Sequence, residues 1–300
     1  MGPTRQDLTL AGQGIFRGAF VLSPKFVVMA LRKPDQTILV RSRRRRFEEW
    51  DRRLGAVPVL RKAVCLLEWL YESLDHWTVS VQWRLRGESH EALAKRLAGG
   101  WGLVVALGFG MAIAMVAFSP ALLGDGLARA LAFLGLFWVL KWLPGTDGLF
   151  RMQGAVHRAL SASRSGKIEP ERLAEASAAF QPCPFLAFVL GGFALFAVAS
   201  GVSFYGIRGE GVSGVLFRLV LVLVVFSLVS EVLDRFPKLF AGLQKALWGT
   251  ASIEELEVAG AAVKEMLRLE AGASVVDKLG RSKFMEHEMV VRSIREIPDV

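Results

Sequence analysis

Two long stretches of the sequence carry no charged side chain, and two shorter apolar runs follow them. Residues 97–124 and 176–207 contain no Asp, Glu, Lys or Arg. Each is longer than the roughly 20 residues that an α-helix needs to cross a bilayer. The pattern predicts a mainly α membrane protein whose four transmembrane helices form two hairpins. The expected spans are residues 101–123, 127–143, 185–206 and 215–232.

The N-terminal region has short apolar runs separated by turn-prone residues. Ile15–Leu22 and Phe26–Leu31 are separated by Ser23-Pro24-Lys25, and Thr37–Val40 follows Lys33-Pro34-Asp35-Gln36. Runs of this length between Pro-containing turns are typical of β-strands. The pattern therefore predicts a small N-terminal β-meander.

A helical period replaces this pattern after Pro58, which suits the first turn of a helix. Apolar residues from Leu60 to Val81 recur at three- and four-residue spacing, with Glu68 and Glu72 on the opposite face. An amphipathic helix of this kind could lie flat on a membrane or pack on the meander. The pattern leaves both arrangements open.

The C-terminal region predicts further amphipathic helices on the cytoplasmic side. Pro237 interrupts the helical pattern after the fourth expected span. Ser252-Ile253-Glu254-Glu255 is a capping box, which marks the start of a helix. That helix carries one apolar face, made of Leu256, Ala259, Val263, Met266 and Leu267. Near the end, Met289–Ile294 fits a short strand or helix.

These patterns divide the chain into six segments. They are a basic β-meander with a polybasic segment (1–57), an amphipathic helix region (58–96), a first transmembrane hairpin (97–144), a cytoplasmic loop (145–181), a second hairpin (182–236), and C-terminal helices with a tail (237–300). The first 100 residues have a net charge of +8, whereas the whole chain has +9. Because positive loops stay in the cytoplasm, both termini should face the cytoplasm of a bacterial inner membrane.

The basic segment and a ridge of small residues suggest contacts with lipid and with protein. Arg43, Arg44, Arg45 and Arg46 would attract anionic lipid headgroups, and a solvated loop is the alternative. Nucleic acid is not expected as a partner, because no interleaved aromatic residues accompany the arginines. Small residues recur every four positions in the first span and would pack against another membrane protein or a second copy of the chain. They are Gly102, Ala106, Gly110 and Ala114.

Several motifs, in this order, resemble one bacterial membrane family. They include Gly18–Lys25, Ala30–Asp35, Pro58–Arg61, Gly154-Ala155-Val156-His157 and Phe180-Gln181-Pro182-Cys183. The chain is similar in these positions to the uncharacterised YqhQ-like family, whose members are described as predicted metal-dependent enzymes. The resemblance covers roughly residues 12–268 and implies a cytoplasmic cluster of metal-binding side chains.

The chain departs from that family at two positions that the metal would need. Val156 stands where the family has Glu, and Phe180 stands where it has His. Neither side chain can coordinate a metal. The polar residues that remain as site candidates are His157, Cys183, Glu231 and Gln244.

Two functions are consistent with these residues. The first is a non-catalytic subunit or scaffold of a membrane protein complex, with its functional face in the cytoplasm and no cofactor. The alternative is a metal-dependent enzyme at the cytoplasmic face of the membrane that uses His157, Cys183 and Glu231. A transporter is disfavoured because the expected spans offer few polar side chains to line a pathway. The sequence also lacks a P-loop, a nucleophile elbow and an HExxH motif.

Overall fold

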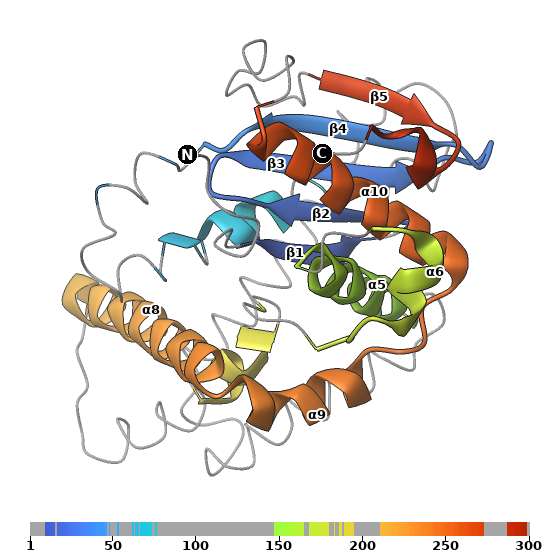
Figure 1. The fold of residues 1–300 in the computed structure, drawn as a ribbon. Helices are drawn as coiled ribbons and strands as arrows, with labels where there is room; N and C mark the ends of the chain where they lie inside the picture. The colour runs from blue at the N-terminus through green and yellow to red at the C-terminus, as the bar shows by residue number, and fades with distance from the viewer. Residues whose placement is uncertain are drawn as a thin grey trace.

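A five-stranded antiparallel sheet is the centre of the part of the chain that the computed structural model describes (Figure 1). The strands are β1 (Ala11–Ile15), β2 (Gly18–Leu22), β3 (Phe26–Arg32), β4 (Ile38–Arg44) and β5 (His287–Val291). The described residues are 10–15, 17–46, 48, 53, 62, 64–65, 67–73, 76, 147–164, 168–179, 183, 186–187, 189–194, 211–272 and 287–298. The strands expected at Phe26–Leu31 and Thr37–Val40 are present, and the expected run Ile15–Leu22 is divided between two strands.

The strand order in the sheet follows the chain, from β1 to β5. Four strands come from the N-terminal 44 residues, and the fifth comes from the C-terminal tail. Ile38 of β4 pairs with Val291, and Ser42 pairs with His287. The tail residues expected as a short strand or helix therefore complete the sheet, followed by the 3₁₀ turn η2 (Ile294–Glu296).

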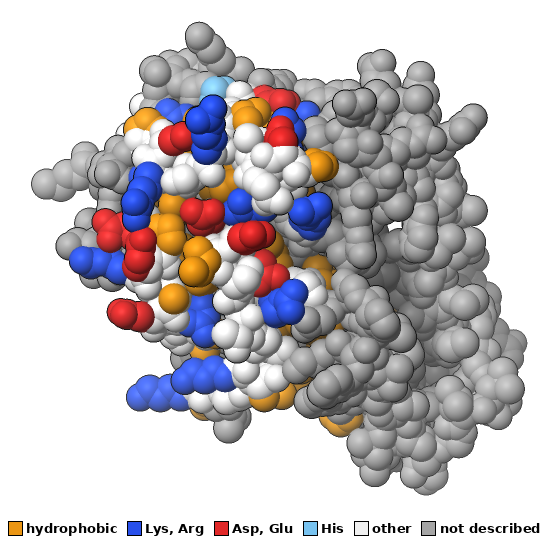
Figure 2. All heavy atoms as spheres, turned by 90° about the vertical axis from the view of Figure 1, so that its right-hand side faces the viewer, with side chains coloured by type: hydrophobic (Ala, Val, Ile, Leu, Met, Phe, Trp, Pro, Cys, Tyr) orange, Lys and Arg blue, Asp and Glu red, His pale blue; other side chains and the backbone are white. Residues whose placement is uncertain are grey.

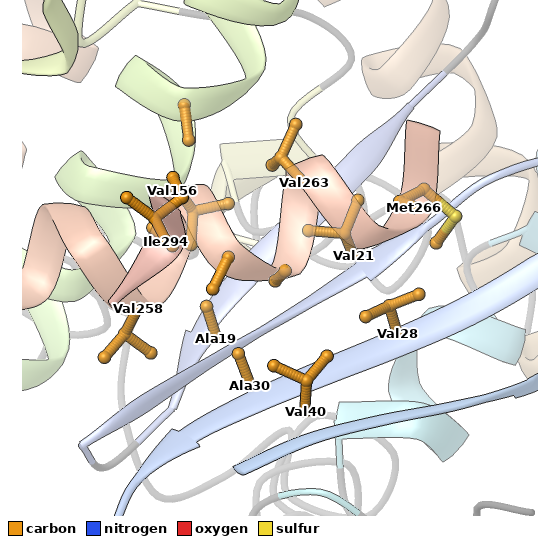
Figure 3. Packing of buried hydrophobic residues seen from close by; sticks show 14 of the residues in the cluster. Ala19, Val21, Val28, Ala30, Val40, Val156, Val258, Val263, Met266 and Ile294 are labelled. Carbon is orange, nitrogen blue, oxygen red and sulfur yellow. The ribbon is translucent and has the colours of Figure 1, made fainter. Parts of the chain in front are cut away.

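Two helices cover one face of the sheet, because alternate strand residues point toward them. These helices are α5 (Asp147–Ser163) and α10 (Ile253–Glu270), and the short α6 (Pro170–Glu175) packs beside both. Figure 3 shows side chains from the sheet, α5 and α10 meeting in this core. The labelled sheet residues are Ala19, Val21, Val28, Ala30 and Val40, and the helical ones include Val156, Val263 and Met266.

The intervening residues of the same strands form a second core on the opposite face. They include Phe20, Val27, Met29 and Leu31, which cluster with Trp69. Trp69 belongs to the helical segment 67–73. This segment packs on the meander, which was one of the two arrangements that the sequence pattern allowed.

The helix boundaries in the C-terminal region follow the local sequence signals. The Ser252 side chain accepts from the Glu255 backbone N–H, and the Glu255 side chain accepts from the Ser252 backbone N–H. The predicted capping box is therefore confirmed at the start of α10. Pro237 ends α8 (Gly211–Arg235) and begins α9 (Pro237–Leu247), as expected.

Charges of both signs alternate over the outer face of the described α/β part (Figure 2). Ion pairs also join separate elements of this part. Arg32 Nη2 lies 2.8 Å from Glu257 on α10, and Arg295 Nη2 lies 2.7 Å from Glu171 on α6. The Arg295–Glu171 pair is exposed, and an exposed pair contributes little to stability, about 0–1 kcal/mol.

The expected four-span membrane architecture is wrong. Among the helices that the structure describes, none combines the length and the apolar content that a bilayer crossing needs. The expected spans 101–123 and 127–143 lie outside the described residues, as does much of 185–206. The span expected at 215–232 falls within α8, which buries Val225, Phe226 and Leu233 on one side. The mainly α fold class, the transmembrane hairpins and the multi-pass inner-membrane location are therefore withdrawn.

Helix α5 approaches strand β1 so closely that β1 needs glycine at two positions. A Cβ atom at Gly14 would lie 2.5 Å from the Gln153 backbone N, and one at Gly12 would lie 2.6 Å from Val156 Cγ1. Contacts this short do not occur in folded proteins, so the helix would have to move. The spacing Gly12-Gln13-Gly14 thus sets the distance between α5 and the sheet.

We expect Gly14→Ala to lower the free energy of unfolding by about 1–3 kcal/mol, because the clash is with backbone that cannot rotate away. Gly242→Ala is the matched control, since nothing lies within 4 Å of a Cβ built at this exposed position of α9. That change should stabilise the protein by about 0.5–1 kcal/mol through helix propensity. Chemical denaturation of both variants measures the difference. Equal effects would show that α5 does not constrain β1.

Candidate functional site

The Gln153 side chain joins α5 to the edge strand of the sheet. Its Oε1 accepts from the Gly14 backbone N–H at 2.8 Å, and its Nε2 donates to the Gly12 carbonyl at 3.2 Å. These two backbone groups have no strand partner on that side, because β1 is the last strand of the described sheet. The amide of Gln153 thus makes the two hydrogen bonds that a peptide group of a sixth strand would make.

His157 lies one helical turn after Gln153 and extends this network. Its Nε2 lies 2.9 Å from Gln153 Nε2, and its Nδ1 lies 3.0 Å from the Ala178 carbonyl oxygen. A carbonyl oxygen can only accept, so Nδ1 carries the proton and Nε2 accepts from the Gln153 amide. Both ring nitrogens are therefore engaged within the protein.

Burial keeps the His157 imidazole uncharged. Desolvation lowers the pKa of His157 to about 4, against a smaller opposing effect of the Ala178 carbonyl. The ring also makes an edge contact with Trp248, with 5.4 Å between the ring centroids. Trp248 in turn stacks on Phe150 of α5 at 6.4 Å. The neutral imidazole of His157 thus connects α5 with Ala178 and with Trp248, the residue that follows α9.

Two other candidates of the predicted polar cluster lie near the same aromatic group. Cys183 is buried in one cluster with Ala178 and Trp248, and its Sγ accepts from the Leu186 backbone N–H at 3.4 Å. Gln244 is buried on α9, and its backbone carbonyl accepts from the Trp248 N–H at 2.9 Å. His157 therefore contacts Trp248, Cys183 lies in the same apolar cluster as Trp248, and Gln244 meets Trp248 through its backbone carbonyl.

The structure does not bring Glu231 into this group. Glu231 lies on α8 with its side chain 40% exposed, and its Oε1 is 3.4 Å from Arg235 Nε. Within the described residues, no set of three or more His, Cys, Asp or Glu side chains is placed to hold a metal ion. Val156, at the position where the resembling family has Glu, is fully buried between α5 and the sheet. Phe180 lies outside the described residues.

A second polar cluster lies on the opposite face of the sheet and is made of buried charges. Arg43 Nη2 donates to both carboxylate oxygens of Glu72, and neither side chain is exposed. His76 Nε2 lies 3.2 Å from Glu72 Oε2. Nearby, Arg45 Nε donates to Glu68 Oε2 at 2.5 Å.

These pairs place part of the polybasic segment in the interior. Arg43 and Arg45 are both buried, so their guanidinium groups are not at the surface, where lipid headgroups would meet them. Arg44 and Arg46 are half-buried, and Arg46 donates to the Tyr71 hydroxyl. The expected headgroup contact therefore does not describe Arg43 and Arg45, whose carboxylate partners come from the helical segment.

The arrangement stabilises the charged form of Glu72. Burial by itself raises the pKa of this carboxyl, but hydrogen bonding and charge from His76 and Arg43 outweigh burial, so the pKa of Glu72 lies below its ordinary value of 4.5. A buried carboxylate paired in this way acts as a clamp between β4 and the helix that carries it. Removing one partner leaves an uncompensated charge inside the protein.

Sequence reasoning missed Gln153, Trp248 and the inward direction of the acidic face. The spacing Gly12-Gln13-Gly14 and the four-residue interval from Gln153 to His157 were the available signals. Glu68 and Glu72 were expected to point away from the packing face, yet both are buried, whereas Leu67 is 49% exposed. The arginines at the end of β4 and directly after it explain the inversion, because Arg43 and Arg45 are buried and need acidic partners.

The ridge of small residues, Gly102, Ala106, Gly110 and Ala114, lies outside the described residues. No family model, no curated protein and no solved structure matches the chain. The function is therefore inferred from the contacts of the chain itself.

We expect acid to destabilise the protein through His157. Between pH 6.5 and about 4, the unfolded chain takes up a proton at this residue and the folded chain does not. The free energy of unfolding should therefore fall as the pH falls through this window, by about 3 kcal/mol in total. Denaturation curves of the wild type and of His157→Gln, which cannot titrate, isolate this contribution. The same pH slope in both proteins would contradict it.

We also expect the Arg43–Glu72 pair to behave as one unit. Arg43→Met or Glu72→Leu should each cost about 3–5 kcal/mol, because each leaves a buried charge without its partner. The double variant Arg43→Met/Glu72→Leu should be more stable than either single variant. The exposed pair Arg172–Glu169 is the control, and Glu169→Gln should change stability by less than about 0.5 kcal/mol. Additive effects at Arg43 and Glu72 would show that the two side chains are not coupled.

Proposed function

We propose that the chain is a non-catalytic subunit of a protein complex. Its α/β unit would act as a rigid scaffold to which the other subunits bind. The observation that supports this most directly is the hydrogen bonding of His157. This histidine is the centre of the candidate polar cluster, and both of its ring nitrogens are used to hold α5, the β1 edge and the 178 segment together. Its contacts are those of a structural residue.

The neighbouring candidates support the same proposal. Cys183 packs among apolar side chains, a common environment for a cysteine with a structural role. Gln244 is buried, and Glu231 pairs with Arg235 on its own helix. Together with His157, these residues contribute to packing and helix contacts rather than to one shared centre.

We propose further that the chain is a divergent relative of the YqhQ-like family. Val156 would then be a replacement that converts a polar position into part of the core, since it is fully buried against the sheet. On this proposal the metal site implied by the resemblance has been lost in this chain. The scaffold proposal does not depend on this relationship.

Metal titration of the purified protein tests the proposal without any variant. We expect saturating zinc or iron(II) to leave the free energy of unfolding unchanged, because the described residues include no group of three or more side chains placed to bind either ion. Specific binding would instead stabilise the folded chain, by about 2.7 kcal/mol at a hundredfold excess over Kd.

Substitution of the candidate ligands supplies the second measurement. His157→Ala and Cys183→Ala should lower stability and leave the metal content unchanged, as measured by elemental analysis. Stoichiometric metal in the wild type that disappears in His157→Ala would favour the metal-dependent enzyme and overturn the scaffold.

A further inference from the structure

Helix α8 presents a stripe of large apolar side chains to solvent near its C-terminal end. Leu228 is 52% exposed, Val232 is 46% exposed and Phe236, directly after the helix, is 56% exposed. Residues four apart lie on the same side of a helix, so the three side chains form one continuous stripe. The Phe236 N–H still bonds to the Val232 carbonyl, which keeps Phe236 in line with the helix.

The other side of α8 already has its packing partners. Phe226 is buried beside Ala194, and Leu233 is buried in the cluster that contains Cys183. Figure 1 shows α8 lying apart from the sheet, so the stripe is not part of the two cores of the α/β unit. The helix is thus held in place by one side while the opposite side stays exposed.

Single exposed apolar residues are ordinary, but a stripe over three consecutive turns is not. Ile253 at the start of α10 is 70% exposed and stands alone between polar neighbours. Ile253 is thus at least as exposed as the residues of the α8 stripe, but it is isolated, whereas the stripe is continuous. A continuous stripe of this kind is suited to packing against another helix.

Two charged residues beside the stripe indicate which kind of helix could pack against it. Glu231 and Arg235 border the stripe on one flank, with side chains 40% and 73% exposed. They have opposite charges and are separated by four residues, the same spacing as the apolar residues. Such a flank is complementary to its own copy when two helices run antiparallel, because the acid of each then meets the base of the other.

We propose that this face of α8 binds the same face of a second copy of the chain. A two-fold axis beside Val232 places Leu228 of each copy against Phe236 of the other, and Val232 against its equivalent. The same axis keeps the charged flanks on one side, where Glu231 of each copy lies beside Arg235 of the other. Apolar contact drives the association, and the charges fix its direction and register.

This inference deepens the proposed scaffold function, and it rests on that function only for its biological purpose. A scaffold with a two-fold interface presents each of its other surfaces twice. The interface itself follows from the exposure, spacing and charge of α8. Its failure would leave the structural role of His157 unchanged.

Sedimentation equilibrium of the purified full chain tests the interface. We expect the wild type to dimerise at concentrations of roughly 1–100 µM, where interfaces of ordinary size associate. Phe236→Glu should raise the dissociation constant about thirtyfold or more, because both Leu228–Phe236 contacts are lost in each dimer. Ile253→Glu is the matched control and should leave the dissociation constant unchanged.

Charge exchange between two variants distinguishes this interface from any other. Glu231→Arg alone and Arg235→Glu alone should each weaken self-association about tenfold, since like charges then face each other across the axis. An equimolar mixture of the two variants should form a heterodimer as tight as the wild type, because opposite charges meet again. The intrahelical pair is broken in both variants, so restored binding can only come from contacts between chains.

Three results would overturn the proposal. They are a wild type that remains monomeric throughout the concentration range, a dimer that survives Phe236→Glu, and a mixture that binds no better than its components. Because Glu231 and Arg235 are exposed, their variants remain informative even if Phe236→Glu does not fold. Metal that depends on His157 would instead remove the scaffold function and leave the interface standing.

Discussion

The hydrogen bonding of one amide side chain determines how the α/β unit is assembled. A sheet that ends at β1 exposes the N–H of Gly14 and the C=O of Gly12, and Gln153 satisfies both. The amide can do so only if α5 lies against the strand, and the two glycines make that distance possible. The second N–H of Gln153 then fixes the tautomer of His157, which holds the Ala178 carbonyl. The Gln153 amide thus bears on three features: the position of α5, the satisfied edge of β1 and the tautomer of His157.

The opposite face of the sheet is organised by buried charge rather than by apolar surface alone. Arg43 follows the alternation of β4 and points into the protein, where an unpaired guanidinium would be very costly. The helical segment therefore turns its acidic side inward, and Glu72 binds Arg43 while Trp69 fills the neighbouring apolar core. Leu67 is exposed as a result. A rule that places every apolar face inside fails here, because Arg43 and Arg45 are buried and bind the acidic side of the segment.

Local signals in the sequence predicted local structure well, and long-range contacts were not visible in it. The capping box at Ser252 and the break at Pro237 are confirmed, because they depend on neighbouring residues only. The strands β3 and β4 follow from apolar runs between turns. The membrane architecture is wrong, because no described helix is long and apolar enough to cross a bilayer, and α8 packs one of its sides against protein. The sequence motifs suggested that His157 and Cys183 belong to one site. The role of Gln153 could not be predicted, because it depends on where the edge of β1 lies in the fold.

The sheet takes four strands from the start of the chain and its fifth from the end. Val40 of β4 pairs with Met289 of β5, so the ribosome synthesises the partner of β4 about 250 residues later. At ribosomal speeds of about 5–20 residues per second, the nascent β2–β4 segment waits on the order of ten seconds or longer before α10 and β5 emerge. During that time its apolar surface and the outer edge of β4 lack their final cover. Production of this protein in cells should accordingly depend on chaperones that shield the N-terminal strands until α10 and β5 have been made.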